Sequence, residues 1–294
     1  MNNKDDNTIL EVENLSVSFT QYASGSERRN IEVIHDISLS VKSGEILAVI
    51  GASGSGKSLL AHAIMGILPV NANTGGTIKY KGQILDDKLK EELRGKEMAL
   101  IPQSVSYLDP LISVKNQIAS PFEKASKKEK RTFISKLLKK FQLDNKVSEQ
   151  YPFELSGGMA RRVLISTAIT SGAKLIIADE PTPGMHESVV EETLKSFKSM
   201  AENGAGLLMI THDIDLAFTI ADRVAVFCDG RVVSIEDTEN FVSHPDRLKS
   251  AYSRALWHAL PQNGFYVEKG KTYDASITDS EETLKAIKLQ KEAV

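Results

Sequence analysis

The chain has 294 residues, and its 41% hydrophobic and 26% charged content is typical of a globular protein rather than a disordered or fibrous one. Its formal net charge of −3 argues against a dedicated nucleic-acid binder, which would need a basic face, so no nucleic-acid partner is expected. The polar residues 1–8 lack a signal-peptide pattern, and no apolar run approaches the roughly 18–20 residues that span a bilayer. A role at a membrane would therefore require docking to other subunits.

The apolar patterns along the chain predict an α/β fold. Alternating apolar residues in 10–19 and again in 31–41 predict an antiparallel pair of strands. Short apolar runs then predict central strands buried on both faces, at 46–50, 98–101, 175–178, 207–210 and 224–227. A helical pattern over 188–200, with Gly204 as its stop, supports a strand, helix, strand order.

Residues 104–171 contain no convincing strand, and two helical patterns predict a helical insert in the core. Asp229-Gly230, between two apolar runs, predicts a hairpin turn because both positions tolerate positive φ. We expect four parts: a β subdomain with the first half of the core at 1–103, the helical subdomain at 104–171, the second half of the core at 172–240 and a C-terminal extension at 241–294.

An unbroken GxxxxGK[ST] motif follows the predicted strand 46–50 and precedes a helical run. This setting favours a phosphate-binding loop over a merely glycine-rich turn. Backbone N–H groups would converge on phosphate oxygens, the Lys57 side chain would reach the β- and γ-phosphates, and the Ser58 hydroxyl would bind magnesium. The predicted nucleotide contacts are Gly51, Ser53, Gly54, Ser55, Gly56, Lys57 and Ser58.

Two carboxylates, Asp179 and Glu180, follow the buried run 175–178, at the strand end where open α/β sheets place ligand chemistry. An acidic pair in this position is often only a helix cap. Beside a phosphate-binding loop, however, Asp179 is expected to hold magnesium through water, and Glu180 to act as general base on the attacking water.

Gln103 and His212 each follow a predicted strand, 98–101 and 207–210 respectively. Both strands are expected to neighbour the strand before the phosphate loop, so both side chains would face the γ-phosphate. Isolated Gln and His residues are usually structural. The order of Gln103 and His212 relative to the other motifs is what favours a role for them at the nucleotide site.

Leu155-Ser156-Gly157-Gly158-Met159 resembles the LSGGQ signature of ABC ATPases, with Met in place of Gln. The phosphate loop, Gln103, the signature, Asp179-Glu180 and His212 occur in that family's order, so the resemblance covers about residues 10–265. It implies a P-loop NTPase (RecA-like) core with an antiparallel β subdomain and an inserted α-helical subdomain.

The resemblance also implies site roles. Glu180, His212 and Gln103 would be catalytic, and Ser58, Gln103 and Asp179 would surround Mg²⁺. Two ATPase subunits would face each other head to tail with ATP between them, so that Ser156, Gly157 and Gly158 serve the partner's nucleotide. Ser156 would at the same time cap the following helix.

An aromatic residue before the phosphate loop stacks on adenine in this family. Phe19 is the first candidate and Tyr22 the second. A place for Phe19 in the strand core is nearly as consistent with the sequence.

Within the family, the LSGGM variant followed by Arg161-Arg162 resembles the oligopeptide, dipeptide and nickel importer group, as does the C-terminal stretch 252–261. That likeness implies a peripheral protein on the cytoplasmic face of the cell membrane. Its partners would be a second ATPase subunit, two transmembrane permease subunits and an extracytoplasmic solute-binding protein. Peptide and metal-chelate solutes are both open.

The chain departs from the family after Asp-Glu-Pro-Thr, where Pro183, Gly184, Met185 and His186 replace a stretch that normally ends in Leu-Asp. The missing Asp normally contacts the opposing phosphate loop. We therefore expect the partner ATPase to be a different chain and the two ATP sites to be unequal, with neutral drift as the alternative.

Other functions remain open at this stage. A soluble ABC ATPase of translation or repair is disfavoured by the single phosphate loop and the lack of sustained heptads. An efflux component, or an ATP-binding subunit that does not hydrolyse ATP, is also compatible with the motifs.

Overall fold

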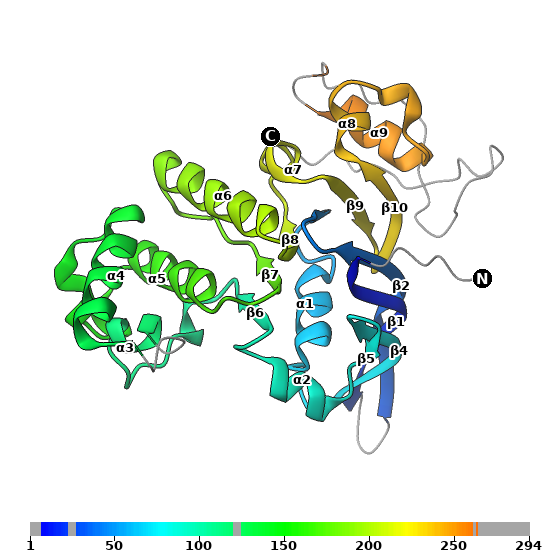
Figure 1. The fold of residues 1–294 in the computed structure, drawn as a ribbon. Helices are drawn as coiled ribbons and strands as arrows, with labels where there is room; N and C mark the ends of the chain where they lie inside the picture. The colour runs from blue at the N-terminus through cyan, green and yellow to red at the C-terminus, as the bar shows by residue number, and fades with distance from the viewer. Residues whose placement is uncertain (1–6, 23–27, 120–124, 261–262, 264–294) are drawn as a thin grey trace.

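The computed structural model describes residues 7–22, 28–119, 125–260 and 263. The described residues fold into two β-sheets and a set of helices (Figure 1). The strands are β1 (Thr8–Tyr22), β2 (Arg28–Lys42), β3 (Ile46–Ile50), β4 (Ala72–Tyr80), β5 (Gln83–Ile84), β6 (Met98–Ile101), β7 (Leu175–Asp179), β8 (Gly206–Thr211), β9 (Arg223–Cys228) and β10 (Arg231–Asp237). The helices are α1 (Lys57–Met65), α2 (Asp87–Leu93), α3 (Val114–Ala119), α4 (Lys127–Lys140), α5 (Gly157–Thr170), α6 (Glu187–Glu202), α7 (Ile214–Ile220), α8 (Thr238–Val242) and α9 (Ala251–Ala259).

The smaller sheet confirms the predicted antiparallel pair. β1 pairs with β2 on one side and with β4 on the other, both antiparallel, and the full order is β2-β1-β4-β5. Leu10, Val12 and Val17 of β1 are buried while polar neighbours face outward, which is the alternation of a sheet covered on one face. This sheet lies on the opposite side of the molecule from α3, α4 and α5 (Figure 1).

The larger sheet has the order β10-β9-β3-β8-β7-β6. β9, β3, β8, β7 and β6 run parallel, and β10 pairs antiparallel with β9 at one edge. All five predicted central strands are therefore confirmed. The predicted position of one of them is wrong, because β6 lies at the far edge and β8 and β7 separate it from β3.

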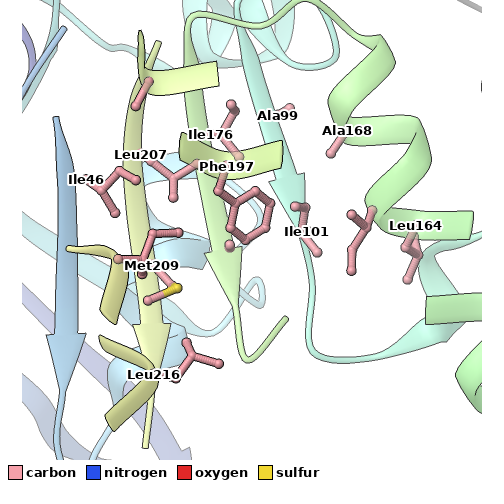
Figure 2. Close-up of a cluster of buried hydrophobic side chains, with 14 of the residues drawn as sticks. Ile46, Ala99, Ile101, Leu164, Ala168, Ile176, Phe197, Leu207, Met209 and Leu216 are labelled. Atoms are coloured by element: carbon pink, nitrogen blue, oxygen red, sulfur yellow. The ribbon is translucent and has the colours of Figure 1, made fainter. Parts of the chain in front are cut away.

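Both faces of the larger sheet are buried, which explains the continuous apolar runs of its strands. Along β3, Ile46, Ala48 and Ile50 point into one hydrophobic cluster, and Leu47 and Val49 point into another. The first cluster includes residues of α5, α6 and α7, and Figure 2 shows side chains of α5 facing those of β6 and β7. The second includes α1 and the small sheet. A nucleotide site at the strand ends is thus held from both sides.

The helical insert is confirmed over the described part of residues 104–171, which holds helices and no strand. α4 begins with a capping box formed by Ser126 and Glu129, and its apolar face buries Ile134, Leu137 and Leu138. These residues belong to the same cluster as β6 and β7. The insert therefore packs continuously with the core.

The predicted hairpin turn is confirmed between β9 and β10. Asp229 has φ 45° and Gly230 has φ 74°, as a two-residue turn with both central residues left-handed requires. The Gly230 carbonyl accepts the His35 N–H of β2 at 2.8 Å, and a Cβ on Gly230 would lie 2.2 Å from the Val33 carbonyl oxygen. The turn thus joins the two sheets at a point where only glycine fits.

Candidate nucleotide-binding site

The predicted phosphate loop lies between the end of β3 and the start of α1. Gly54 has φ 78° and Gly56 has φ 101°, conformations that L side chains rarely adopt. A Cβ on Gly51 would lie 2.2 Å from the Phe227 carbonyl oxygen of β9. Glycines at these positions let the loop fold tightly against the sheet just before the N-terminus of α1, a helix end that favours anions.

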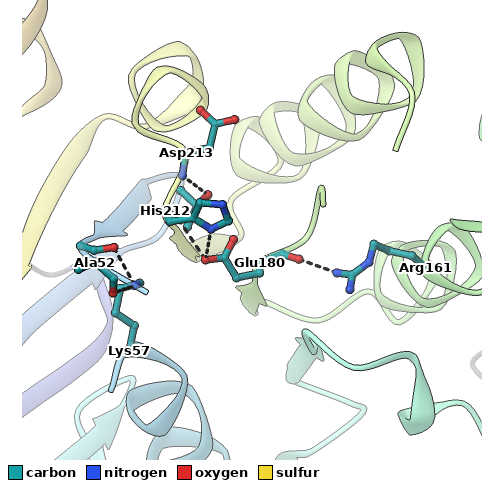
Figure 3. Close-up of polar contacts among 8 residues, drawn as sticks. Ala52, Lys57, Arg161, Glu180, His212 and Asp213 are labelled. Atoms are coloured by element: carbon teal, nitrogen blue, oxygen red, sulfur yellow. Dashed lines mark hydrogen bonds and ion pairs between the residues drawn. The ribbon is translucent and has the colours of Figure 1, made fainter. Parts of the chain in front are cut away.

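The Lys57 side chain turns back over the loop. It is 6% exposed, and its Nζ donates to the carbonyl oxygens of Gly51 at 2.9 Å and Ala52 at 2.7 Å (Figure 3). Burial lowers the pKa of the ammonium, while the negative charges of Glu180 and Asp179 oppose that shift. A cation therefore stands at the mouth of the loop, facing two carboxylates.

Asp179 is the last residue of β7 and is only 2% exposed. Burial raises the pKa of its carboxyl, and a hydrogen bond from the Ser58 hydroxyl opposes that shift. The structure thus brings together the two residues that were predicted to surround magnesium from the phosphate loop and from β7. Asp179 Oδ1 has no hydrogen-bond partner among the described residues.

Glu180 adopts the left-handed backbone conformation, with φ 47°, which is costly for a residue with a Cβ. Its N–H donates to the Ile210 carbonyl at 2.9 Å. Its Oε1 accepts the His212 N–H at 3.1 Å and faces His212 Nδ1 at 2.8 Å (Figure 3). An ionised carboxylate only accepts hydrogen bonds, so the Nδ1–H of His212 donates to Glu180 Oε1, and Nε2 takes no part in this contact. The ring is 59% exposed, which leaves it accessible to a ligand.

Gln103 follows the edge strand β6 and is exposed. No hydrogen bond among the described residues joins its side chain to the phosphate loop, but its backbone carbonyl accepts a hydrogen bond from Arg161 Nη2. Arg161 Nη1 donates to the Glu180 carbonyl at 2.5 Å. Sequence reasoning missed Arg161 as a site residue, because an arginine in a basic pair carries no signal of which backbone oxygens it will meet.

The signature begins α5. Ser156 is the N-cap, and its Oγ accepts the Met159 N–H at 3.3 Å, so the predicted cap is confirmed. Gly157 and Gly158 form the first turn, and nothing lies within 4 Å of a Cβ on Gly157. No hydrogen bond among the described residues joins these three to the phosphate loop of the same chain, and their service to a second subunit stays a prediction.

Phe19 lies in β1, half-buried against the cluster shared by α1 and the small sheet. Packing in the strand explains that burial, and stacking on adenine stays a prediction. The side chain of Tyr22 lies outside the described residues.

The donor set fits a magnesium-bound nucleotide. Three buried polar atoms around the loop have no hydrogen-bond partner among the described residues: Ser55 Oγ, Asp179 Oδ1 and Glu180 Oε2. Buried polar groups are normally satisfied, so such atoms at one site point to a polar ligand. Carboxylate and hydroxyl oxygens are the ligands that Mg²⁺ prefers, and a buried lysine beside a glycine-rich helix start suits a polyphosphate.

Comparison with known proteins agrees with this geometry. Residues 34–183 match the family described as ABC transporter. This chain belongs to the ABC transporter family. A solved dimeric bacterial ABC transporter cassette superposes on 78% of this chain and 99% of its own length, with a TM-score of 0.67 and 26% identity.

Two curated relatives indicate which group of the ABC transporter family this chain resembles. The glutathione import ATP-binding protein GsiA of Escherichia coli O6:H1 is 32% identical over 276 residues, 87% of this chain and 42% of the relative. The dipeptide transport ATP-binding protein DppD of Bacillus subtilis is 30% identical over 266 residues, 86% of this chain and 77% of the relative. This ABC transporter chain thus spans less than half of the first relative. The likeness to the oligopeptide and dipeptide importer group is confirmed.

Proposed function

We propose that this chain is the ATP-hydrolysing subunit of a membrane importer that takes up a peptide or a metal chelate of the nickel type. The names of the relatives, glutathione import and dipeptide transport, support the peptide class. The metal-chelate class rests on the sequence resemblance alone. The observation that carries hydrolysis is the Glu180 carboxyl, which His212 holds through Oε1 while the buried Oε2 has no partner among the described residues.

The proposal assigns a role to each side chain of the site. Lys57, Ser53, Ser55 and the loop N–H groups bind the phosphates. Glu180 takes a proton from the attacking water at Oε2. His212 orients the Glu180 carboxyl and faces the terminal phosphate with its exposed edge.

Mg²⁺ would be held by Ser58 and Asp179, with Gln103 approaching from β6, and when bound it neutralises charge on the phosphates. The Ser58 hydroxyl and the Asp179 carboxyl already lie within hydrogen-bond reach of each other. The four-part division of the chain at 103, 171 and 240 also stays a proposal, because the insert shares its hydrophobic cluster with the core.

The proposed partners are a second ATPase subunit, two transmembrane permease subunits and an extracytoplasmic solute-binding protein, with this chain on the cytoplasmic face of the membrane. No helix in the described residues is long and apolar enough to span a bilayer. Apolar side chains on the insert support docking, since Leu111 is 85% and Phe153 is 74% exposed. The Val114 N–H donates to the Gln150 carbonyl at 2.9 Å and so brings their two segments together.

Hydrolysis is tested with two substitutions in the purified assembly. Glu180→Gln keeps an oxygen that can accept from His212 but loses the base, so we expect ATP turnover to fall by about 100-fold or more with ATP affinity unchanged. Lys57→Ala removes the cation and should weaken ATP binding itself. A Glu180→Gln protein that turns over at the wild-type rate would remove Glu180 from this role.

Transport is tested by tagging the chain in its native cell and identifying the proteins that copurify from gently solubilised membranes. Multispanning subunits and a solute-binding protein would support import, and that binding protein can be screened with peptides and with nickel chelates. Recovery only from the soluble fraction, with ribosomal or repair proteins, would contradict import and favour a soluble ABC ATPase.

We also propose that the second ATPase is a different chain and that the two ATP sites are unequal. Pro183, Gly184 and His186 are exposed between β7 and α6, where the family has its coupling Asp. The Gly184 carbonyl lies 3.6 Å from the position of a Cβ on Gly158, so this segment adjoins the signature. His186 Nδ1 instead faces the Ser188 hydroxyl at 3.1 Å.

The unequal-site proposal is tested by disabling the base of one ATPase at a time in the intact transporter. We expect the two half-disabled complexes to hydrolyse ATP at different rates. His186→Asp should bring the rates closer together. Equal rates in the two complexes would refute the proposal.

A further inference from the structure

Arg161 leaves the first turns of α5 and places its guanidinium between two loops of the core. Nη1 donates to the Glu180 carbonyl at 2.5 Å (Figure 3), and Nη2 donates to the Gln103 carbonyl. These carbonyls follow β7 and β6, which are neighbouring parallel strands. One side chain therefore connects the signature helix to the backbone beside the candidate base and beside Gln103.

The contact with Glu180 has a specific consequence, because Glu180 is the residue with φ 47°. A side-chain-bearing residue remains left-handed only where its surroundings fix it. Three groups of Glu180 are fixed here: its N–H by the Ile210 carbonyl, its Oε1 by His212 and its carbonyl by Arg161. Only the Arg161 bond comes from the helical insert, and a charged donor makes it stronger than a neutral one.

The charge of Arg161 suits this position. Burial lowers the pKa of the guanidinium, and the negative charges of Glu180 and Asp179 oppose that shift. Guanidinium groups stay protonated in proteins, so the two hydrogen bonds persist across the working pH range. The fork of N–H donors also reaches two carbonyls at once, which an ammonium group does not do in the same geometry.

The neighbouring Arg162 shows that this is not a general property of the basic pair. Its Nε donates to the Gly158 carbonyl at 3.1 Å, and its Nη1 donates to the carbonyls of Phe141 at 3.2 Å and Gln142 at 2.9 Å. All three acceptors lie in the helical insert. Arg162 therefore stabilises the insert, and Arg161 joins the insert to the catalytic backbone.

We propose that Arg161 is a positioning residue, which fixes the left-handed backbone of Glu180 and makes that backbone depend on the position of the signature helix. The inference rests on the proposed function of Glu180 as general base. Movement of α5 would then change the alignment of the Glu180 carboxyl without any contact between the insert and the nucleotide of the same subunit.

The first test compares Arg161→Ala with wild type in the purified assembly. We expect kcat to fall at least 10-fold while the dissociation constant for ATP stays within 2-fold, because the phosphate-binding residues are untouched. Arg161→Lys should recover part of kcat, since one carbonyl can still be reached. A wild-type kcat in Arg161→Ala, or a loss of kcat matched by an equal loss of ATP affinity, would overturn the proposal.

The second test needs no activity. The Glu180 N–H is protected by its bond to Ile210, so Arg161→Ala should speed hydrogen exchange in residues 179–182, and Arg162→Ala, the matched control, should not. Equal acceleration in both variants would show a merely structural role and refute the proposal. If Arg161→Ala does not fold, Arg161→Lys with wild-type kcat and wild-type exchange refutes it instead. A wild-type assembly without ATPase activity would overturn the proposed function, and the exchange comparison would still decide the role of Arg161.

Discussion

Asp179→Asn should make the protein more stable in the absence of nucleotide and magnesium. Asp179 is 2% exposed, one of its oxygens has no hydrogen-bond partner among the described residues, and Glu180 adds a second negative charge beside it. A buried polar group without its partner costs about 1–3 kcal/mol. Because the Asn amide is neutral but still incompletely bonded, we expect a gain of about 1–2 kcal/mol. For a chain of this size that corresponds to a rise in Tm of about 2–8 °C.

The pH dependence of this gain has a definite sign. Burial raises the pKa of Asp179 above its ordinary value of 3.8, so the folded state binds the proton more tightly than the unfolded state does. The wild type is then most stable below the unfolded pKa and loses that stability as pH rises through the folded pKa. The advantage of Asp179→Asn should therefore grow with pH.

Thermal unfolding followed by circular dichroism, in a chelator and without ATP, measures this effect. Asp222→Asn is the matched control, because Asp222 Oδ2 already accepts the Ile46 N–H at 2.8 Å, and no gain is expected there. In a second measurement, Asp179→Asn should weaken magnesium-dependent ATP binding. An Asp179→Asn protein that melts below the wild type at neutral or alkaline pH would show that the buried carboxylate is not a source of strain.

Two further predictions concern single residues. Gly51→Ala should lower Tm by about 2–12 °C, since a Cβ 2.2 Å from the Phe227 carbonyl oxygen forces β3 and β9 apart at a cost of about 1–3 kcal/mol. Gly54→Ala, with nothing within 4 Å of its Cβ position, should lose only about 1 kcal/mol through its φ of 78°. Equal losses in differential scanning calorimetry would contradict the steric argument. Glu97→Gln should lower the free energy of unfolding by about 0.5 kcal/mol at neutral pH and leave it unchanged in acid. Hydrogen bonds from Lys81 and Tyr80 lower the pKa of this half-exposed carboxyl, and the stability they provide is lost as pH falls through the folded pKa. Urea titrations at both pH values would refute this prediction if the loss were the same at each.

The sequence predicted the elements better than their arrangement. Strands such as β3 are recognisable because both faces are buried and every residue is apolar, and the phosphate loop is recognisable because its chemistry requires a fixed spacing of glycines and lysine. The edge position of β6 was missed, since an apolar run does not state which strands will flank it. The left-handed Glu180 and the two acceptors of Arg161 were also missed, because both depend on loops that meet only after the sheet and the insert have packed.

The signature helix can act as a lever. α5 packs along its length in the hydrophobic cluster on the sheet, from Ala160 through Leu164 to Ala168, and its N-terminus carries the Ser156 cap and the signature glycines. The 12 positions from Ser156 to Ala168 span about 18 Å at the rise of an α-helix, so a tilt of about 10° about Ala168 displaces Ser156 by about 3 Å. A displacement of that size is about the length of a hydrogen bond. A small rotation of the insert is therefore sufficient to make or break contact with a nucleotide on the facing subunit, and Arg161, near the moving end, would carry the same rotation to Glu180.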